Sequence, residues 1–265
     1  MTTLYIKHLL LRTPLEQPAL RLRHFAESFY RMRHPELREV FEEEDGIGQV
    51  VRQVVQPGSN CIDIGCHIGS SLSLMARYAP HGTHLAIEPV AEKAAWIRKK
   101  FPEVEVRAIA LGERQEAVTF YQNVARPGFS SLAKNVESGD EIVAMTVDCE
   151  RLDNVARTDL KYAFIKIDVE GAELLVLKGA RETIARSRPV ILFESSYDGA
   201  AKLGLKREDL FAFFGVELGY DVFTIKRFLE RQSKLDLAGF QRAAEYPFQA
   251  FNFVAVPRPL SIRNE

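Results

Sequence analysis

The nonapeptide Cys61-Ile62-Asp63-Ile64-Gly65-Cys66-His67-Ile68-Gly69 decides the fold class of this chain. Its first four residues form a short, largely apolar run that ends at a glycine, and residues 71–76 continue with a helical pattern. The glycines let the backbone approach a ligand closely, and the first N–H groups of the helix face the same point. The stretch therefore predicts a strand–turn–helix unit with a ligand at the turn.

The alternation of strand and helix continues along the chain. One predicted helix contains Ala94, Trp96 and Ile97, another starts over residues 172–177, and a third spans 209–218. Strands are predicted at 84–88, 104–111, 117–121, 162–168, 189–193, 220–225 and 251–256, and residues 123–140 as a loop. Repeated βα units imply a mostly parallel sheet with helices on both faces. The last two predicted strands are spaced differently from these units, which allows an antiparallel edge strand. We expect an α/β fold with a doubly wound, Rossmann-like sheet.

The first part of the chain has a different pattern. Residues 17–55 are predicted to be largely helical, with a break at His34-Pro35 because proline interrupts a helix. We divide the chain into an N-terminal helical extension, residues 1–45, and a main domain, residues 46–265. The acidic run 42–45 follows a locally basic stretch, and this pairing predicts a solvated helical surface.

Composition excludes several classes of protein. Of the 265 residues, 46% are hydrophobic and 27% are charged, which is typical of a globular domain and not of a disordered chain. The formal net charge of −1 provides no global field for nucleic acid or an anionic membrane, so no nucleic-acid partner is expected. No run of about 18 apolar residues predicts a membrane span. Lys7 and Arg12 interrupt the N-terminal apolar stretch, which argues against a signal peptide.

The three cysteines are an odd number and lack the spacing of a zinc site. Cys61 and Cys66 lie in or beside an apolar run, where a free thiol acts as a small hydrophobe. A reducing cytoplasm suits them, and we expect a cytoplasmic location. The sequence does not indicate an oligomeric state.

Asp63, the two glycines and Glu88 together predict a nucleoside-bearing ligand. Glu88 ends the next predicted strand, where a carboxylate can accept two hydrogen bonds from a ribose diol. A dinucleotide fingerprint needs a second glycine where this chain has His67, and the charge of Asp63 disfavours a pyrophosphate. The ammonium and sulfonium of S-adenosylmethionine suit that charge. The structural alternative is a tight turn between strand and helix with Glu88 solvated.

Several further stretches match one family. They are Ala86-Ile87-Glu88-Pro89, Ala110-Leu111-Gly112, Phe164-Ile165-Lys166-Ile167-Asp168-Val169-Glu170-Gly171-Ala172-Glu173, Val176-Leu177-Lys178-Gly179-Ala180 and Arg188-Pro189-Val190-Ile191-Leu192-Phe193-Glu194. With the nonapeptide they resemble the FkbM family of class I methyltransferases over roughly residues 45–256. The resemblance implies S-adenosylmethionine as cofactor and methyl transfer to a hydroxyl of a sugar, glycan or secondary metabolite.

The resemblance also implies the cofactor-binding residues. They are Asp63, Gly65, Cys66, His67, Gly69, Glu88 and Ala110. The family more often has Ala and Asn at positions 66 and 67, so backbone contacts to the cofactor are expected to survive the change. The His67 side chain has two open interpretations, as a contact to the cofactor or as a loop residue bonded to the backbone.

Carboxylates at strand ends are the candidates for the chemistry. An alcohol is a weak nucleophile until a base takes its proton, and Asp168 and Glu194 follow strands expected to be neighbours. We predict that these two orient the acceptor and remove its proton. Glu170 has the alternative of capping the turn at Gly171. Glu173 lies where a helix begins and has the alternative of complementing its dipole.

Three further expectations concern the same region. Lys166 alternates with apolar residues in its strand, so an ion pair with a neighbouring acid is expected rather than catalysis. Converging carboxylates are also how proteins hold magnesium, but no spacing demands it, and we expect no metal. The loop 128–132 either covers the cofactor or acceptor or is an ordinary surface loop.

Other functions stay open at this point. A methyltransferase acting on nitrogen or on RNA would have the same cofactor half, although the chain lacks an evident platform of aromatic residues for stacking bases. A binding module without catalysis would retain the fold. A dehydrogenase would need the missing glycine.

Overall fold

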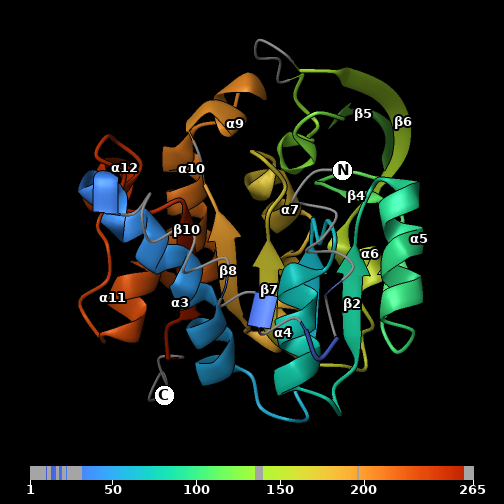
Figure 1. Ribbon diagram of the computed structural model, residues 1–265, viewed down its shortest axis with the longest axis horizontal. Coiled ribbons are helices and arrows are strands. Elements are labelled where there is room, and N and C mark those ends of the chain that lie inside the picture. Colours follow the sequence, from blue (N-terminus) through green and yellow to red (C-terminus); the bar gives the residue numbers. More distant parts are fainter. Residues whose placement is uncertain are drawn as a thin grey trace, which may run out of the picture.

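A computed structural model describes residues 32–134, 140–195 and 197–259, together with positions 10, 13–15, 18, 19 and 22. A seven-stranded sheet forms its centre (Figure 1), with the strand order β3-β2-β1-β7-β8-β10-β9. The strands are β1 (Asn60–Ile64), β2 (His84–Ile87), β3 (Glu105–Arg107), β7 (Tyr162–Ile167), β8 (Val190–Glu194), β9 (Tyr220–Thr224) and β10 (Asn252–Pro257). Only β10 runs against its neighbours in this sheet. The predicted doubly wound fold is confirmed, with the antiparallel strand one position inside the edge.

Helices cover both faces of the sheet because its central strands are apolar on both sides. One face packs against α3 (Arg38–Val54), α4 (Ser70–Tyr78), α5 (Ala91–Lys100) and α11 (Ile225–Leu229). The other face packs against α6 (Leu152–Val155), α7 (Glu173–Lys178), α8 (Arg181–Ser187), α10 (Arg207–Ala212) and α12 (Leu237–Ala243). In β1 the side chains of Cys61 and Ile62 enter opposite cores, as alternation along a strand requires. Asp63 and Lys166 therefore lie on the face that α3 and α4 cover.

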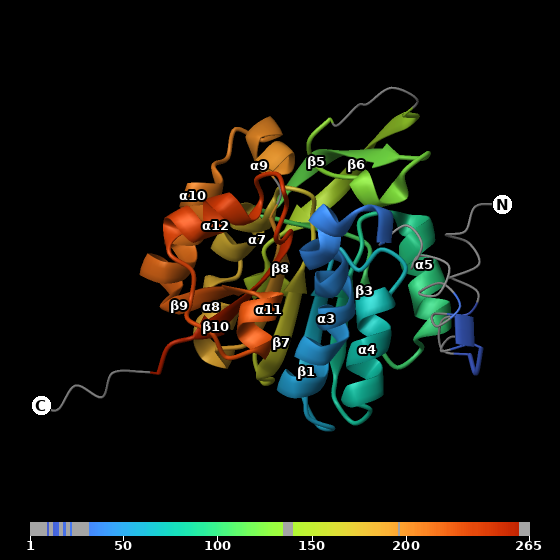
Figure 2. The same ribbon diagram turned by 60° about the vertical axis from the view of Figure 1, so that its left-hand side comes forward.

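A second, smaller sheet stands beside the carboxyl edge of the first, as the two views agree (Figures 1 and 2). It consists of β4 (Ala110–Leu111), β6 (Ile142–Glu150) and β5 (Glu116–Asn123), in that order, with β5 and β6 forming an antiparallel hairpin. The predicted strand 117–121 is part of β5, whereas β6 was not predicted. Most of β6 is exposed or half-buried, so its sequence lacks a strong apolar alternation. The predicted run 104–111 is divided between β3 and β4.

The structure of the N-terminal part confirms the predicted helix break and contradicts the predicted exposure of the acidic run. A short 3₁₀ turn, Pro35–Leu37, lies at the predicted break and is followed by α3, which crosses the proposed boundary between residues 45 and 46. Glu43 is only 7% exposed, so the expectation of a wholly solvated acidic run is wrong. Most of the predicted extension lies outside the described residues. None of the described helices is long and apolar enough to span a membrane.

The remaining helical elements lie near the carboxyl edge or the β9 edge. They are α9 (Tyr197–Lys202), the 3₁₀ turn Pro127–Phe129 and a π-helical segment, Phe213–Leu218, that continues α10. The prediction of one helix over 209–218 thus covers two elements of different geometry. All three cysteines are buried free thiols.

Candidate cofactor and acceptor site

The turn between β1 and α4 is held in a shape that needs its glycines. Gly65 and Gly69 have φ angles of 73° and 83°, and the intervening His67 also has a positive φ of 51°. A Cβ at Gly65 would collide with the backbone carbonyl of Asp168, which follows β7. The carbonyl of Ile87 accepts the backbone N–H groups of residues 65 and 66, both at 3.0 Å. The turn is therefore tied to the ends of both neighbouring strands.

Glu88 fixes the same turn from the side of β2. Its carboxylate accepts the backbone N–H of His67 at 2.9 Å and that of Val90 at 3.0 Å. The side chain is buried, and burial raises the pKa of Glu88 to about 6, opposed by the charge of Lys93. Each carboxylate oxygen can accept a further hydrogen bond, so Glu88 remains able to bind a diol.

A cavity opens at the carboxyl edge of the sheet beside this turn. Of the residues predicted from sequence, it is lined by Gly65, His67, Glu88, Ala110 and Asp168. Glu170, the missed residues Lys93 and Phe120, and the loop residues Gly128, Ser130 and Leu132 complete much of its wall. The loop 128–132 therefore borders the cavity and is not merely surface. Lys93 follows the Glu88-Pro89 pair into the first turn of α5, which is the signal that could have identified it.

Four of the predicted residues do not line the cavity: Asp63, Cys66, Gly69 and Glu194. Cys66 packs in the apolar core, and a Cβ at Gly69 would meet the ring of Phe101. These two positions support the turn from behind. The predicted cofactor-binding set thus divides into residues that face the cavity and residues that shape its wall.

Asp63 is completely buried next to Lys166, its partner in the register of β1 and β7. Within the described residues neither of its oxygens has a hydrogen bond of good geometry, although the Leu72 amide lies near enough to favour the charged form. Burial raises the pKa of Asp63 to about 6 against the charge of Lys166. The carboxyl groups that do line the cavity, those of Glu88, Asp168 and Glu170, fit a cationic ligand.

Asp168, Glu170 and Glu194 form a cluster in which carboxylate oxygens lie within 4.8 Å of one another. Lys166 donates to Asp168 across 2.6 Å, so the expected ion pair is confirmed. Burial raises the pKa of Asp168, but Lys166 and hydrogen bonds from its neighbours outweigh it, and the net shift is downward. Burial and the charge of Asp168 hold the pKa of Glu194 well above its usual range. The two opposite shifts favour the ionised form of Asp168 and the protonated form of Glu194.

The two remaining acids differ from each other. Glu173 accepts the backbone N–H groups of Val169 at 3.3 Å and Gly171 at 3.1 Å, so it stabilises the start of α7 as its structural alternative predicted. The N–H of Gly171 is thus bonded to Glu173, and the capping role suggested for Glu170 is wrong. Burial raises the pKa of Glu170 to about 8. The negative charge of Asp168 disfavours a second charge on Glu170 beside it. Glu170 can therefore donate a hydrogen bond in its protonated form, and Asp168 can accept one.

The strand order, the glycine turn and the acid that ends β2 define a class I methyltransferase fold. The sequence profile of the Methyltransferase FkbM domain matches residues 63–230, which is more than half of the chain. The chain belongs to the FkbM methyltransferase family, and its cofactor is S-adenosylmethionine. No curated protein matches the chain at a significant level.

Solved structures give distant matches. An FkbM methyltransferase from Methylobacillus flagellatus KT is 17% identical over 76% of this chain and 44% of its own length, with a TM-score of 0.46. This chain thus spans less than half of that protein. A methyltransferase from Geobacter sulfurreducens in complex with S-adenosylhomocysteine is 15% identical over 81% of this chain and 91% of its own (TM-score 0.41). A putative rRNA methylase from Clostridium thermocellum is 11% identical over 78% and 90% (TM-score 0.45). Likenesses this distant do not bear on the acceptor.

Proposed function

We propose that the protein is an O-methyltransferase that acts on a hydroxyl of a sugar, glycan or secondary metabolite. The observation that carries this proposal is the Asp168–Glu194 pair, in which Asp168 lines the cavity and Glu194 belongs to the same cluster of carboxyl groups. A hydroxyl group of the acceptor can donate its hydrogen bond to Asp168. Nitrogen acceptors need no such base when they are neutral amines, so the pair favours oxygen.

The residues of the chain would divide the reaction between them. S-adenosylmethionine supplies an electrophilic methyl group, and the turn at Gly65 together with Glu88 would hold its nucleoside part. Asp168 would accept the proton as the hydroxyl oxygen forms its bond to the methyl carbon and the bond from carbon to sulfur breaks. Glu194 would orient Asp168 and the acceptor. Most of the rate would come from alignment, because the displacement must be in line.

The acidic cluster also supports a neutral acceptor over RNA. The ionised form of Asp168, which its lowered pKa favours, would repel a phosphate group near the cavity, and its partner cation Lys166 is buried. We assign no metal to the cluster. A cytoplasmic location and the division into residues 1–45 and 46–265 stand as proposals alongside this one.

Two measurements test the proposal. Calorimetric titration with S-adenosylhomocysteine, with NAD as the comparison, should give binding of the first alone. Incubation with S-adenosylmethionine labelled in its methyl group and a panel of hydroxylated sugars, amines and RNA should then label a hydroxyl compound. Transfer to RNA or to an amine, with none to the hydroxyl compounds, would refute the O-methyltransferase assignment.

A further inference from the structure

A row of polar side chains crosses the carboxyl ends of three neighbouring strands. The register pairs Ile167 with Phe193, so Asp168 lies opposite Glu194, and Glu194 in turn is paired with Asn252 of β10. Residues paired across adjacent strands share one face and lie about 5 Å apart. Asn252 therefore continues the row of Asp168 and Glu194 away from the cofactor turn.

Glu43 of α3 holds Asn252 in place. Its Oε1 accepts both the backbone N–H of Asn252 at 2.9 Å and the side-chain Nδ2 at 2.7 Å. Its Oε2 accepts the backbone N–H of Phe251 at 2.9 Å. Three hydrogen bonds to one buried carboxylate fix both the strand and the amide plane. Because the amide nitrogen faces Glu43, the carbonyl oxygen of Asn252 is the group free to accept from elsewhere.

We propose that Asn252 binds the methyl acceptor and that Glu43 is the residue that positions it. This inference rests on the proposed function and extends its acceptor site along the row from Asp168 through Glu194 to Asn252. Both new residues lie outside the matched range 63–230, in the first long helix and the last strand of the described chain. The acceptor site is therefore completed by parts of the chain that flank the shared domain.

The chemistry of the row defines the kind of acceptor. Asp168, Glu194 and the Asn252 carbonyl all present oxygens that can accept hydrogen bonds along the row, which suits a compound with several neighbouring hydroxyl groups. The cation bonded to the row, Lys166, is buried and already paired with Asp168, so it is not available to recognise a phosphate group. We infer a neutral, polyhydroxylated acceptor such as a sugar ring, and not its phosphorylated counterpart.

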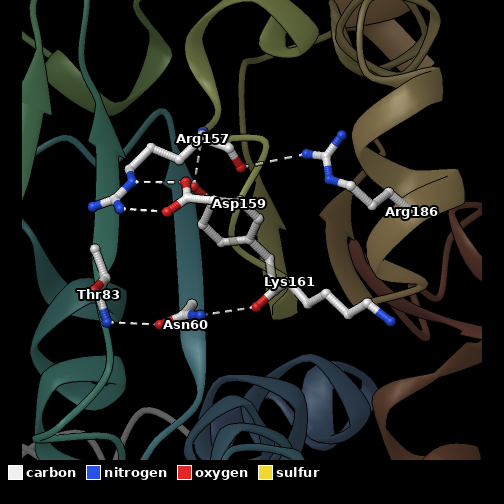
Figure 3. Close-up of polar contacts among 7 residues, drawn as sticks. Asn60, Thr83, Arg157, Asp159, Lys161 and Arg186 are labelled. Carbon is white, nitrogen blue, oxygen red and sulfur yellow. Dashed lines mark hydrogen bonds and ion pairs between the residues drawn. The ribbon is translucent and has the colours of Figure 1, made fainter.

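The opposite edge of the sheet provides a matched control (Figure 3). There Asn60 also ties neighbouring strands, donating from Nδ2 to the Lys161 carbonyl at 2.9 Å and accepting the Thr83 N–H at 2.8 Å. Substitution of Asn60 removes a similar set of hydrogen bonds far from the cavity. For Glu43 the control is Glu42, one residue earlier, whose contacts are surface ion pairs with Arg38 and Lys226.

The test measures binding of neutral glycosides to the full chain saturated with S-adenosylhomocysteine. Saturation-transfer NMR with methyl α-D-glucopyranoside, methyl α-D-mannopyranoside and methyl α-L-rhamnopyranoside gives a Kd for each, and α-D-glucose 1-phosphate serves as the anionic probe. We expect at least one glycoside to bind better than the phosphate. Asn252→Ala should weaken its binding roughly fivefold or more, whereas Asn60→Ala and Glu42→Gln should not.

A double-mutant cycle separates positioning from general support. Glu43→Gln should weaken glycoside binding in the parent but add nothing in the Asn252→Ala background, while the Kd for S-adenosylhomocysteine stays constant. Should Asn252→Ala not fold, Asn252→Leu, which is close in size and lacks the carbonyl oxygen, replaces it with the same expectation. Unchanged glycoside binding in the Asn252 variant, stronger binding of the phosphate, or no glycoside binding by a parent that binds S-adenosylhomocysteine would each overturn the inference. Failure of the parent to bind S-adenosylhomocysteine would instead refute the proposed function.

Discussion

Glu88 makes two backbone hydrogen bonds and still has lone pairs for a ribose, so its removal has a defined cost. We expect Glu88→Ala to weaken binding of S-adenosylhomocysteine roughly ten- to a hundredfold, the usual loss for hydrogen bonds to a charged group. Glu92→Ala, an exposed position on the following helix, is the control and should bind as the parent does. Calorimetry gives both values. Equal affinity of the Glu88 variant would show that the ribose is held elsewhere.

Asp168 and Glu194 should affect turnover rather than cofactor binding. Loss of a positioned base or of its partner lowers rates by roughly a hundred- to ten-thousandfold. We therefore expect Asp168→Asn and Glu194→Gln to lower kcat within that range on a confirmed acceptor, with S-adenosylhomocysteine binding nearly unchanged. Asp159→Asn, whose carboxylate pairs with Arg157 at the far edge of the sheet (Figure 3), is the control. Full turnover in both site variants would mean that another group takes the proton.

At the level of elements, the turn from β1 to α4 depends on glycine at one position. Gly65 has a positive φ, and a side chain there would meet the Asp168 carbonyl. We expect Gly65→Ala to destabilise the protein by about 1–3 kcal/mol or more, since both strain and a clash oppose it. Gly48→Ala is the contrasting change, because Gly48 lies inside α3 with open space around it and alanine favours a helix by about 0.5–1 kcal/mol. Urea unfolding measures both, and an unaffected Gly65 variant would contradict the strain argument.

The same elements explain what the sequence could predict. The turn and Glu88 were predictable because the apolar run, the two glycines and the acid after the next strand follow one another within a short stretch of sequence. Strand β6 was not, since its exposed residues are specified by pairing with β5, a distant contact. Glu43 was hidden among four consecutive acids, and only the packing of α3 against the start of β10 selects it for burial. Likewise, the sequence could not show whether the carboxylate of Glu170 or that of Glu173 accepts the Gly171 N–H, because both lie nearby.

Across the whole molecule, buried acids make stability depend on pH. Burial raises the pKa of Glu43 and Glu173 to about 7 and that of Glu170 to about 8. A raised folded-state pKa means that the native state binds more protons than the unfolded chain, so this stability is present below about pH 4.5 and is lost as pH rises through 7 to 8. Asp168, with its lowered pKa, opposes the trend only at acidic pH.

We expect the cofactor-free protein to have a higher Tm at pH 5.5 than at pH 8. Scanning calorimetry at the two pH values, in buffers of equal ionic strength, measures the difference. The double variant Glu43→Gln/Glu173→Gln should reduce it, because two of the titrating groups are gone, whereas Glu42→Gln/Glu182→Gln should not. A Tm that rises from pH 5.5 to pH 8 would contradict the assigned protonation states.

The position of β10 in the sheet also determines the order in which the polypeptide can fold during synthesis. Strand β9 joins the sheet only through β10, although it precedes β10 by almost thirty residues. Until those residues leave the ribosome, β8 and β9 each present an unpaired edge, and Glu43 has no partner at Phe251 and Asn252. The nascent chain can therefore assemble its cofactor half while it is still being synthesised, but the acceptor site that we propose at Asn252 must wait for β10.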